Sequence, residues 1–178
     1  MRTVVWRSGL REMGYGTDVV EIREAASAPE FAVVRDLIEQ YAQALGVDLK
    51  LQNFAHEIRH LSEVCGRPQG CLLLAHQASQ AVACVALRGL DVEVCEMKRI
   101  YVMARLRGSG IGRHLVRAVI DRALLLGYRR MVLDTLASMH TALALHRSFG
   151  FRPTESYYRI RFKTRRSWSL TSRTPDPA

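Results

Sequence analysis

The spacing of apolar residues along the chain separates stretches with a helical period from stretches with a strand-like period. After Pro29, apolar positions recur every three or four residues as far as Gly46, which predicts a helix with one buried face. A shorter stretch over residues 52–64 repeats this period. Ahead of these two helices, residues 17–25 alternate loosely between apolar and polar positions, which predicts a weak first strand.

The period changes in the second part of the chain. Apolar runs at residues 71–75 and 81–87 predict a hairpin, and the run at 92–103 predicts a third strand. Residues 110–127 show the clearest helical face. The remaining predicted elements are a strand at 131–136, a helix at 137–149 and a half-buried strand at 157–162.

These elements follow the order β-α-α-β-β-β-α-β-α-β, which predicts a mixed α/β layer fold. A length of 178 residues fits one domain, and we expect that domain to span residues 17–163. Residues 1–16 are predicted to be a flexible leader. Residues 164–178 are predicted to be a basic, disordered tail, because they are polar and contain Pro175 and Pro177.

The net charge of +9 lies mainly at the two ends of the chain. Residues 1–16 contribute +2 and residues 159–178 contribute +5, whereas the long middle contributes only +2. A basic tail can bind nucleic acid or acidic membranes nonspecifically, although such a tail is more often simply solvated. No motif for reading bases is visible, so no specific nucleic-acid partner is expected.

The sequence shows no signal for export or membrane insertion. The apolar cluster near the start is too short for a secretory signal, and no apolar run approaches the roughly 20 residues that span a bilayer. The four cysteines form no CxxC pair, and three of them lie in apolar runs, where cysteine usually behaves as a small buried hydrophobe. We therefore expect a cytoplasmic protein with no membrane partner and no disulfides.

A glycine-rich segment, Arg107-Gly108-Ser109-Gly110-Ile111-Gly112, joins the predicted strand at 92–103 to the helix that follows. Glycines let the backbone approach an anion and adopt positive φ at little cost. The free N–H groups of the helix's first turn also favour an anion, and nearby arginines add charge-assisted partners. A ligand with a pyrophosphate fits this loop, although such a loop can also merely join a strand to a helix.

Three other motifs would give the chain a different function. The loop lacks the context of a dinucleotide fingerprint, because three strands precede it, and no Gly-Lys-Ser/Thr follows as in a P-loop. Residues 56–60 read His-Glu-x-x-His, the zincin zinc-binding pattern. Zincins normally have no charged residue between the glutamate and the second histidine, where this chain has Arg59. No third ligand is marked downstream either, so we expect no bound metal.

Two segments resemble the GNAT acetyltransferases. Residues 95–102 followed by Arg107-x-x-Gly110-x-Gly112 are similar to the coenzyme-A motif of that family, and residues 142–151 are similar to its penultimate helix. The resemblance covers roughly residues 18–158 and implies a GNAT fold, a mixed central β-sheet of about six or seven strands flanked by about four helices. It also implies an N-acyltransferase that moves an acetyl group from acetyl-CoA to a primary amine of a small molecule or peptide by direct attack. Members of the family often form homodimers.

The resemblance also implies which residues hold the cosubstrate. The main chain of Ile100 and Val102 would receive the pantetheine arm, and the Ile100 N–H would face the thioester oxygen, where negative charge develops. The pyrophosphate would lie on the loop residues Arg107, Gly108, Ser109, Gly110, Ile111, Gly112 and Arg113.

Attack on a thioester requires a neutral amine, which a carboxylate can generate directly or through water. Glu96 is the candidate base. Strand alternation is expected to place it on the same face as Lys98, Ile100 and Val102, and opposite Cys95, so no acyl-cysteine is expected. The alternative is a glutamate that merely pairs with Lys98 or Arg99 nearby.

His146 stands where the family commonly has the tyrosine that protonates the leaving thiolate. Imidazole can supply a proton or order a water, although a lone helix histidine often only packs. Phe54, Tyr157 and Tyr158 are candidates for the acceptor cleft, and they fit a core equally well. A second departure follows Tyr158, where relatives often continue through an Asn/Pro loop and this chain runs into a basic stretch at 159–163. The missing tyrosine and this altered end leave a second function open, a non-catalytic sensor or regulatory module that binds acyl-CoA.

Overall fold

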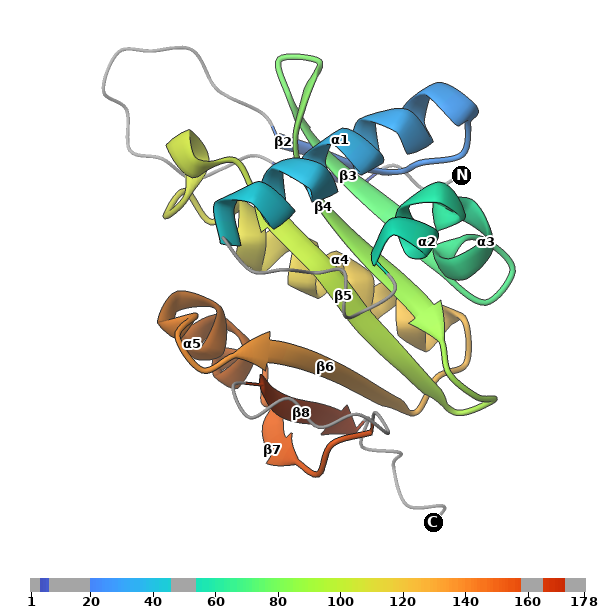
Figure 1. Cartoon of the computed structure of the whole chain (residues 1–178), viewed down its shortest axis with the longest axis vertical. Coiled ribbons are helices and arrows are strands. Elements are labelled where there is room, and N and C mark those ends of the chain that lie inside the picture. The colour runs from blue at the N-terminus through green and yellow to red at the C-terminus, as the bar shows by residue number, and fades with distance from the viewer. Residues whose placement is uncertain (1–3, 7–19, 46–53, 158–164, 172–178) are drawn as a thin grey trace.

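The computed structural model describes residues 4–6, 20–45, 54–157 and 165–171, which form one mixed sheet with helices on both faces (Figure 1). The eight strands lie in the order β1-β2-β3-β4-β5-β6-β8-β7, and only β5 and β6 are parallel neighbours. The predicted α/β class is confirmed. The strands are β1 (Val4–Trp6), β2 (Val20–Glu24), β3 (Cys71–Gln77), β4 (Gln80–Gly89), β5 (Val94–Val102), β6 (Arg130–Leu136), β7 (Arg152–Thr154) and β8 (Arg165–Thr171).

The helices cover the two faces of the sheet unequally (Figure 1). α1, α2 and α3 pack on one face, and α4 packs on the other. The predicted helix over 52–64 is divided in two, because the helical conformation is interrupted at His60 between α2 and α3. The helices are α1 (Ala28–Leu45), α2 (Phe54–Arg59), α3 (Leu61–Cys65), the short 3-10 helix η2 (Ala104–Leu106), α4 (Ile111–Leu125) and α5 (His140–Ser148).

Local sequence explains where the two long helices begin and end. The Ser27 hydroxyl donates to the Glu30 carboxylate at 2.7 Å, and the Ser27 N–H donates to the same oxygen at 3.0 Å. This arrangement is a capping box, which satisfies donors ahead of α1. Gly127 follows α4 with φ of +88°, the left-handed conformation that commonly ends a helix.

Two apolar clusters hold these layers together. Leu115 and Val119 of α4 are fully buried against the face of the sheet that includes Val85. On the opposite face, Ile38 of α1 and Leu61 of α3 are buried in a separate cluster. Burial of one such side chain contributes roughly 1.5–3 kcal/mol, so the sheet is a rigid platform for the loops at its edges.

The parallel strands β5 and β6 pair only at their first residues. Their register ends at Glu96 opposite Val132, although β5 continues for six more residues to Val102. β6 instead pairs with β8 along its whole length, and Figure 1 shows β5 and β6 running apart beyond that point. The far half of β5 therefore has an edge that β6 does not pair.

A β-bulge interrupts β5 and corrects one prediction. Lys98 opposes Ala86 and Tyr101 opposes Cys84, so two residues of β5 lie opposite the single residue between those β4 partners. The bulge reverses the alternation of side chains. As a result, Ile100 packs on the α4 side, whereas Glu96 lies on the opposite face, where it pairs with Lys98.

The predicted placement of Glu96 on the same face as Ile100 and Val102 is therefore wrong. Its placement opposite Cys95 is confirmed, since Cys95 belongs to the cluster under α4.

The two ends of the chain differ from the prediction. β8 lies within the stretch predicted to be a disordered tail, and its Trp168 is buried in the core, so that prediction is wrong over Arg165–Thr171. β1 pairs with β2, so a flexible leader is wrong over Val4–Trp6. Of the predicted strand at 157–162, only Tyr157 is described, and it lies in no strand. No helix within the described ranges is long and apolar enough to cross a membrane.

Candidate active site

One cavity of about 680 Å³ lies between the far half of β5, the start of α4 and the helix α5. It brings together seven of the nine residues that the sequence analysis assigns to the cosubstrate, and it adds His146. Its lining consists of Tyr41, Ile100, Tyr101, Val102, Leu106, Arg107, Gly108, Gly110, Gly112, Arg113, Ser138, Met139, His140, Thr141, Ala142, Leu145 and His146.

The glycine-rich loop presents unused amides at the mouth of α4. Within the described ranges, no backbone acceptor is found for the N–H groups of Gly108, Gly110, Ile111 and Gly112. Other amides of the loop are used internally, since Arg113 donates to the Gly110 carbonyl at 3.0 Å. Because the unused N–H groups gather at the positive end of the helix dipole, this mouth is suited to bind an anion.

The backbone conformation of the loop depends on two glycines. Gly108 has φ of +83° and Gly110 has φ of +91°, a region that costs other residues roughly 1–2 kcal/mol. Gly110 is also the N-cap of α4 and carries no side-chain cap. Of the two predicted residues outside the cavity lining, Ser109 donates its hydroxyl to the Leu106 carbonyl at 2.7 Å, and Ile111 is buried in the core.

The strand side of the cavity offers main-chain groups of β5. The Met103 N–H donates to the Val82 carbonyl of β4 at 3.0 Å. Because amides alternate in direction along a strand, those of Ile100 and Val102 point away from β4, toward the side where β6 has diverged. The Val102 carbonyl accepts a hydrogen bond from Arg107 Nε at 3.3 Å, as expected for a group on that open side.

The arginines at the cavity are held by neighbouring side chains. The Arg107 guanidinium lies 5.9 Å from the Tyr101 ring centroid. Arg113 donates to the Ser148 hydroxyl at 3.2 Å and lies 5.3 Å from the Phe149 ring. Such cation–π contacts keep a guanidinium in place while leaving its remaining donors available for an anion.

His146 lies in the wall of the cavity and is nearly fully buried, with 2% of its surface exposed. Its Nδ1 has no hydrogen-bond partner among the described residues, and its ring packs edge-on against Phe151 at 5.7 Å. Burial lowers the pKa of His146 from 6.5 to about 4. The imidazole is therefore neutral near pH 7, and any proton it donates there comes from the neutral ring.

The buried histidine should make stability depend on pH. Since its pKa is lower in the folded chain, the unfolded chain takes up a proton that the folded chain does not, and stability falls as the pH drops from 6.5 toward 4. We expect a loss of about 1.4 kcal/mol per pH unit from this group, or roughly 3 kcal/mol in total. Denaturant unfolding at several pH values should show that His146→Phe removes this component. Equal slopes for the two proteins would contradict the assignment.

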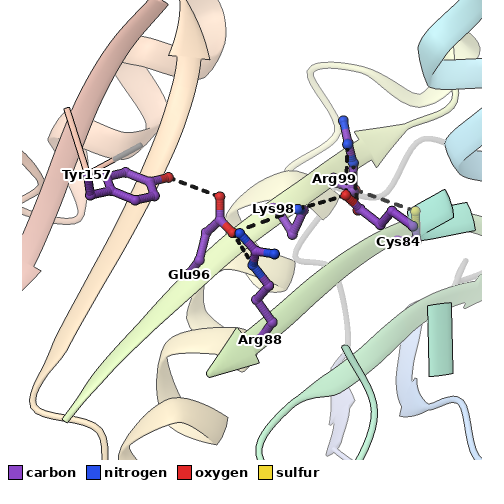
Figure 2. A network of polar contacts seen from close by, with 7 residues as sticks. Cys84, Arg88, Glu96, Lys98, Arg99 and Tyr157 are labelled. Atoms are coloured by element: carbon purple, nitrogen blue, oxygen red, sulfur yellow. Dashed lines mark hydrogen bonds and ion pairs between the residues drawn. The ribbon is translucent and has the colours of Figure 1, made fainter. Parts of the chain in front are cut away.

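Glu96 lies outside the cavity lining, at the last paired residue of β5 and β6. It is 3% exposed, and Figure 2 shows Arg88, Lys98 and Tyr157 converging on its carboxylate. Arg88 Nε donates to Oε2 at 2.5 Å, the Tyr157 hydroxyl donates to Oε1 at 3.0 Å, and Lys98 Nζ lies 3.7 Å away. The alternative of a glutamate that pairs with a neighbouring cation is therefore present in the form of Lys98, together with two partners that the sequence did not suggest, Arg88 and Tyr157.

The two described acceptor-side candidates, Phe54 and Tyr157, contact different partners in the structure. The Arg99 guanidinium lies over the ring of Phe54, with its Cζ 5.1 Å from the ring centroid. Tyr157 contacts Glu96. Tyr158 is outside the described residues. Sequence reasoning missed Tyr41, whose helical spacing marked it only as core and which lines the cavity and contacts Tyr101.

The zincin-like motif serves another purpose in the structure. α2 ends at Arg59, before the second histidine, and the rings of His56 and His60 stack at 4.4 Å. Glu57 turns inward and pairs with Lys98 and Arg99. Among the residues that the structure describes, no group of three or more potential ligands could hold a metal ion.

Comparison with known proteins agrees with this geometry. Residues 31–151 match the sequence profile of the acetyltransferase (GNAT) family. An uncharacterized N-acetyltransferase of Schizosaccharomyces pombe is 40% identical over 124 residues, which cover 68% of this chain and 76% of that protein. The chain therefore belongs to the GNAT family and is an acetyltransferase.

Solved structures show the same fold. An acetyltransferase from Streptococcus agalactiae superposes with a TM-score of 0.71 at 21% identity, over 86% of this chain and 98% of that one. A GNAT acetyltransferase from Elizabethkingia anophelis, solved with acetyl-CoA bound, gives a TM-score of 0.63 at 22% identity, with the same coverage of both chains.

Proposed function

We propose that the chain transfers an acetyl group from acetyl-CoA to a primary amine of a small molecule or peptide. The observation that carries this proposal is the cavity in which unused amides at the mouth of α4 and the unpaired edge of β5 face the same space. The amides of Gly108, Gly110, Ile111 and Gly112 suit the pyrophosphate of coenzyme A. The edge of β5 suits the pantetheine arm, whose amides need main-chain partners.

The residues around the cavity suggest roles in the reaction. The Ile100 N–H would stabilise the oxyanion that forms when the amine attacks the thioester carbonyl. Glu96 would accept the proton of the ammonium, through water since it lies outside the cavity lining. His146, neutral near pH 7, would donate a hydrogen bond to the leaving sulfur rather than act as an imidazolium acid.

A thiol-release assay tests the proposal. The purified chain is incubated with acetyl-CoA and amines of several classes, including polyamines, amino acids and peptides with free termini, and free thiol is measured over time. We expect release that depends on one class of amine. Release that is equal with and without amine would contradict acetyl transfer to an amine.

The same experiment separates the enzyme from an acyl-CoA-binding module. The buried ion pairs of Glu96 and the neutral state of His146 favour that second candidate, because an ion-paired carboxylate is a weaker base and a neutral imidazole is a weaker acid. Heat on titration with acetyl-CoA but no thiol with any amine would indicate a binding module. No heat and no thiol would contradict both.

A further inference from the structure

The bulge in β5 requires a backbone conformation that its sequence does not favour. Arg99 has φ of +56°, in the left-handed region. Bulges with this conformation at their first residue normally have glycine there, because a side chain makes the conformation unfavourable. Something outside the strand must therefore stabilise the bulge.

A buried carboxylate from α2 holds Arg99 in this conformation. Glu57 accepts two parallel hydrogen bonds from the Arg99 guanidinium, Nε to Oε1 at 3.0 Å and Nη2 to Oε2 at 3.1 Å. Lys98, the residue before the bulge, adds a contact of 2.8 Å to Glu57 Oε2. Phe54, also on α2, lies under the guanidinium. The fork-to-fork geometry fixes the direction of the arginine as well as its charge.

The environment makes this pair stronger than a surface salt bridge. The side chains of Glu57 and Arg99 are 8% and 7% exposed. Burial alone would raise the pKa of Glu57, but the hydrogen bonds from Arg99 and the charge of Lys98 lower it to about 2. The carboxylate therefore stays ionised, and removing it would leave two buried cations without their common partner.

The bulge also decides which groups of β5 reach the cavity. One extra residue in the strand exchanges the faces of all side chains beyond it, and it places Ile100 and Val102 in the cavity wall. Without the bulge, the side chains of Ile100 and Val102 would lie on the opposite face of the sheet, and their amides would no longer point toward the cavity. The bulge at Arg99, which α2 contacts through Glu57, therefore sets the edge that faces the cavity.

We propose that Glu57 is a positioning residue that holds the bulge at Arg99, and through it the main-chain groups of Ile100 and Val102 that receive acetyl-CoA. This inference rests on the proposed function, since it concerns the binding of the same cosubstrate. It also explains why α2, which does not line the cavity, has a buried carboxylate directed at β5.

Acetyl-CoA binding by calorimetry tests this role through four variants. Glu57→Gln removes the charge that holds Arg99 and is expected to weaken binding about tenfold, the effect of one lost hydrogen bond. Arg99→Gly removes the pair but accepts the positive φ without strain, and it should bind within about threefold of the unmodified chain. The double variant Glu57→Gln with Arg99→Gly should recover that affinity. Arg99→Lys, which keeps the charge and loses the fork, should bind as weakly as Glu57→Gln.

Glu24 provides a control for loss of a two-bond arginine–carboxylate pair, although its partner Arg67 is more exposed than Arg99. It accepts two hydrogen bonds from Arg67, at 2.8 and 2.9 Å, and contacts Arg122, but it lies in β2 and does not line the cavity. Glu24→Gln should lower thermal stability without changing acetyl-CoA affinity.

The outcomes separate failure of this inference from failure of the proposed function. An unmodified chain that binds no acetyl-CoA would contradict the proposed function. An unmodified chain that binds while Glu57→Gln binds equally well would contradict the inference, and so would a double variant that stays as weak as Glu57→Gln. If Glu57→Gln does not fold, the acetyl-CoA affinities of Arg99→Lys and Arg99→Gly are compared instead. Weaker binding by Arg99→Lys would support the inference, and equal or weaker binding by Arg99→Gly would overturn it.

Discussion

Replacing Gly110 by alanine is expected to weaken acetyl-CoA binding roughly 100-fold, which corresponds to about 2.7 kcal/mol. Gly110 has φ of +91°, and an added Cβ would meet no atom closer than His114 Nε2 at 3.9 Å. The cost is therefore conformational rather than steric, and the loop should relax to a negative φ. That change would rotate the N–H groups that precede α4 away from the cavity. Each rotated N–H would lose its hydrogen bond to a charged phosphate oxygen.

Gly127 provides the matched control for this prediction. It lies at the other end of the same helix with φ of +88°, and a Cβ there would meet nothing within 4 Å. Both glycine-to-alanine changes should lower the free energy of unfolding by about 1–2 kcal/mol. Gly127→Ala, however, should leave the affinity for acetyl-CoA unchanged. Calorimetric titration of both variants, with thermal unfolding in parallel, measures the two effects. Equal affinities for Gly110→Ala and Gly127→Ala would show that the loop does not bind the cosubstrate.

The central part of the fold was predictable because its signals are local. The helical period and the closing glycine of α4, and the strand–loop–helix order around Gly110, depend on neighbouring residues alone. The cavity follows from the same order, since the loop and the far half of β5 adjoin each other in the sequence. Elements that form through local preference are the ones that a single sequence reveals.

The bulge and the buried charges were not predictable, because they depend on contacts between distant residues. Arg99 adopts a left-handed conformation through Glu57, which lies 42 residues earlier. Similarly, nothing local marks His146 as buried, and only packing against Phe151 and the cavity wall lowers its pKa. The role of Glu57 in the zincin-like segment was not predictable for the same reason, since its partners Lys98 and Arg99 come from β5.

The last strand was missed although a local signal existed. The composition of residues 164–178 is polar, and this suggested disorder. Within it, however, Trp168 and Leu170 alternate with serines, the period of a half-buried strand. The antiparallel partner β6 supplies the buried face for Trp168, opposite Leu133. Composition outweighed periodicity in that prediction, and periodicity was the better guide.

Replacing Glu96 by glutamine is expected to lower kcat/KM about 1000-fold, within the range for loss of a general base. Glutamine keeps the shape of the side chain: its one amide oxygen can accept from Arg88, and its NH2 can donate to the Tyr157 hydroxyl oxygen. Loss of the charge beside Arg88 and Lys98 should lower stability, whereas the affinity for acetyl-CoA should change little because Glu96 lies outside the cavity lining. The loss should be greatest at low pH, where few acceptor amines are neutral without a base to deprotonate them. Steady-state rates against pH, with the amine found by thiol release, measure this.

Tyr157→Phe separates a base from a structural ion pair. It removes the hydroxyl that donates to Glu96 Oε1 but leaves the carboxylate in place, so we expect at most about a tenfold loss of kcat/KM, the effect of one hydrogen bond. If Glu96 only neutralises Arg88 and Lys98, Glu96→Gln should keep its rate within about threefold of the unmodified chain, although its unfolding temperature falls in either case. That outcome would remove Glu96 from the chemistry, and the amine would then have to reach the thioester already neutral.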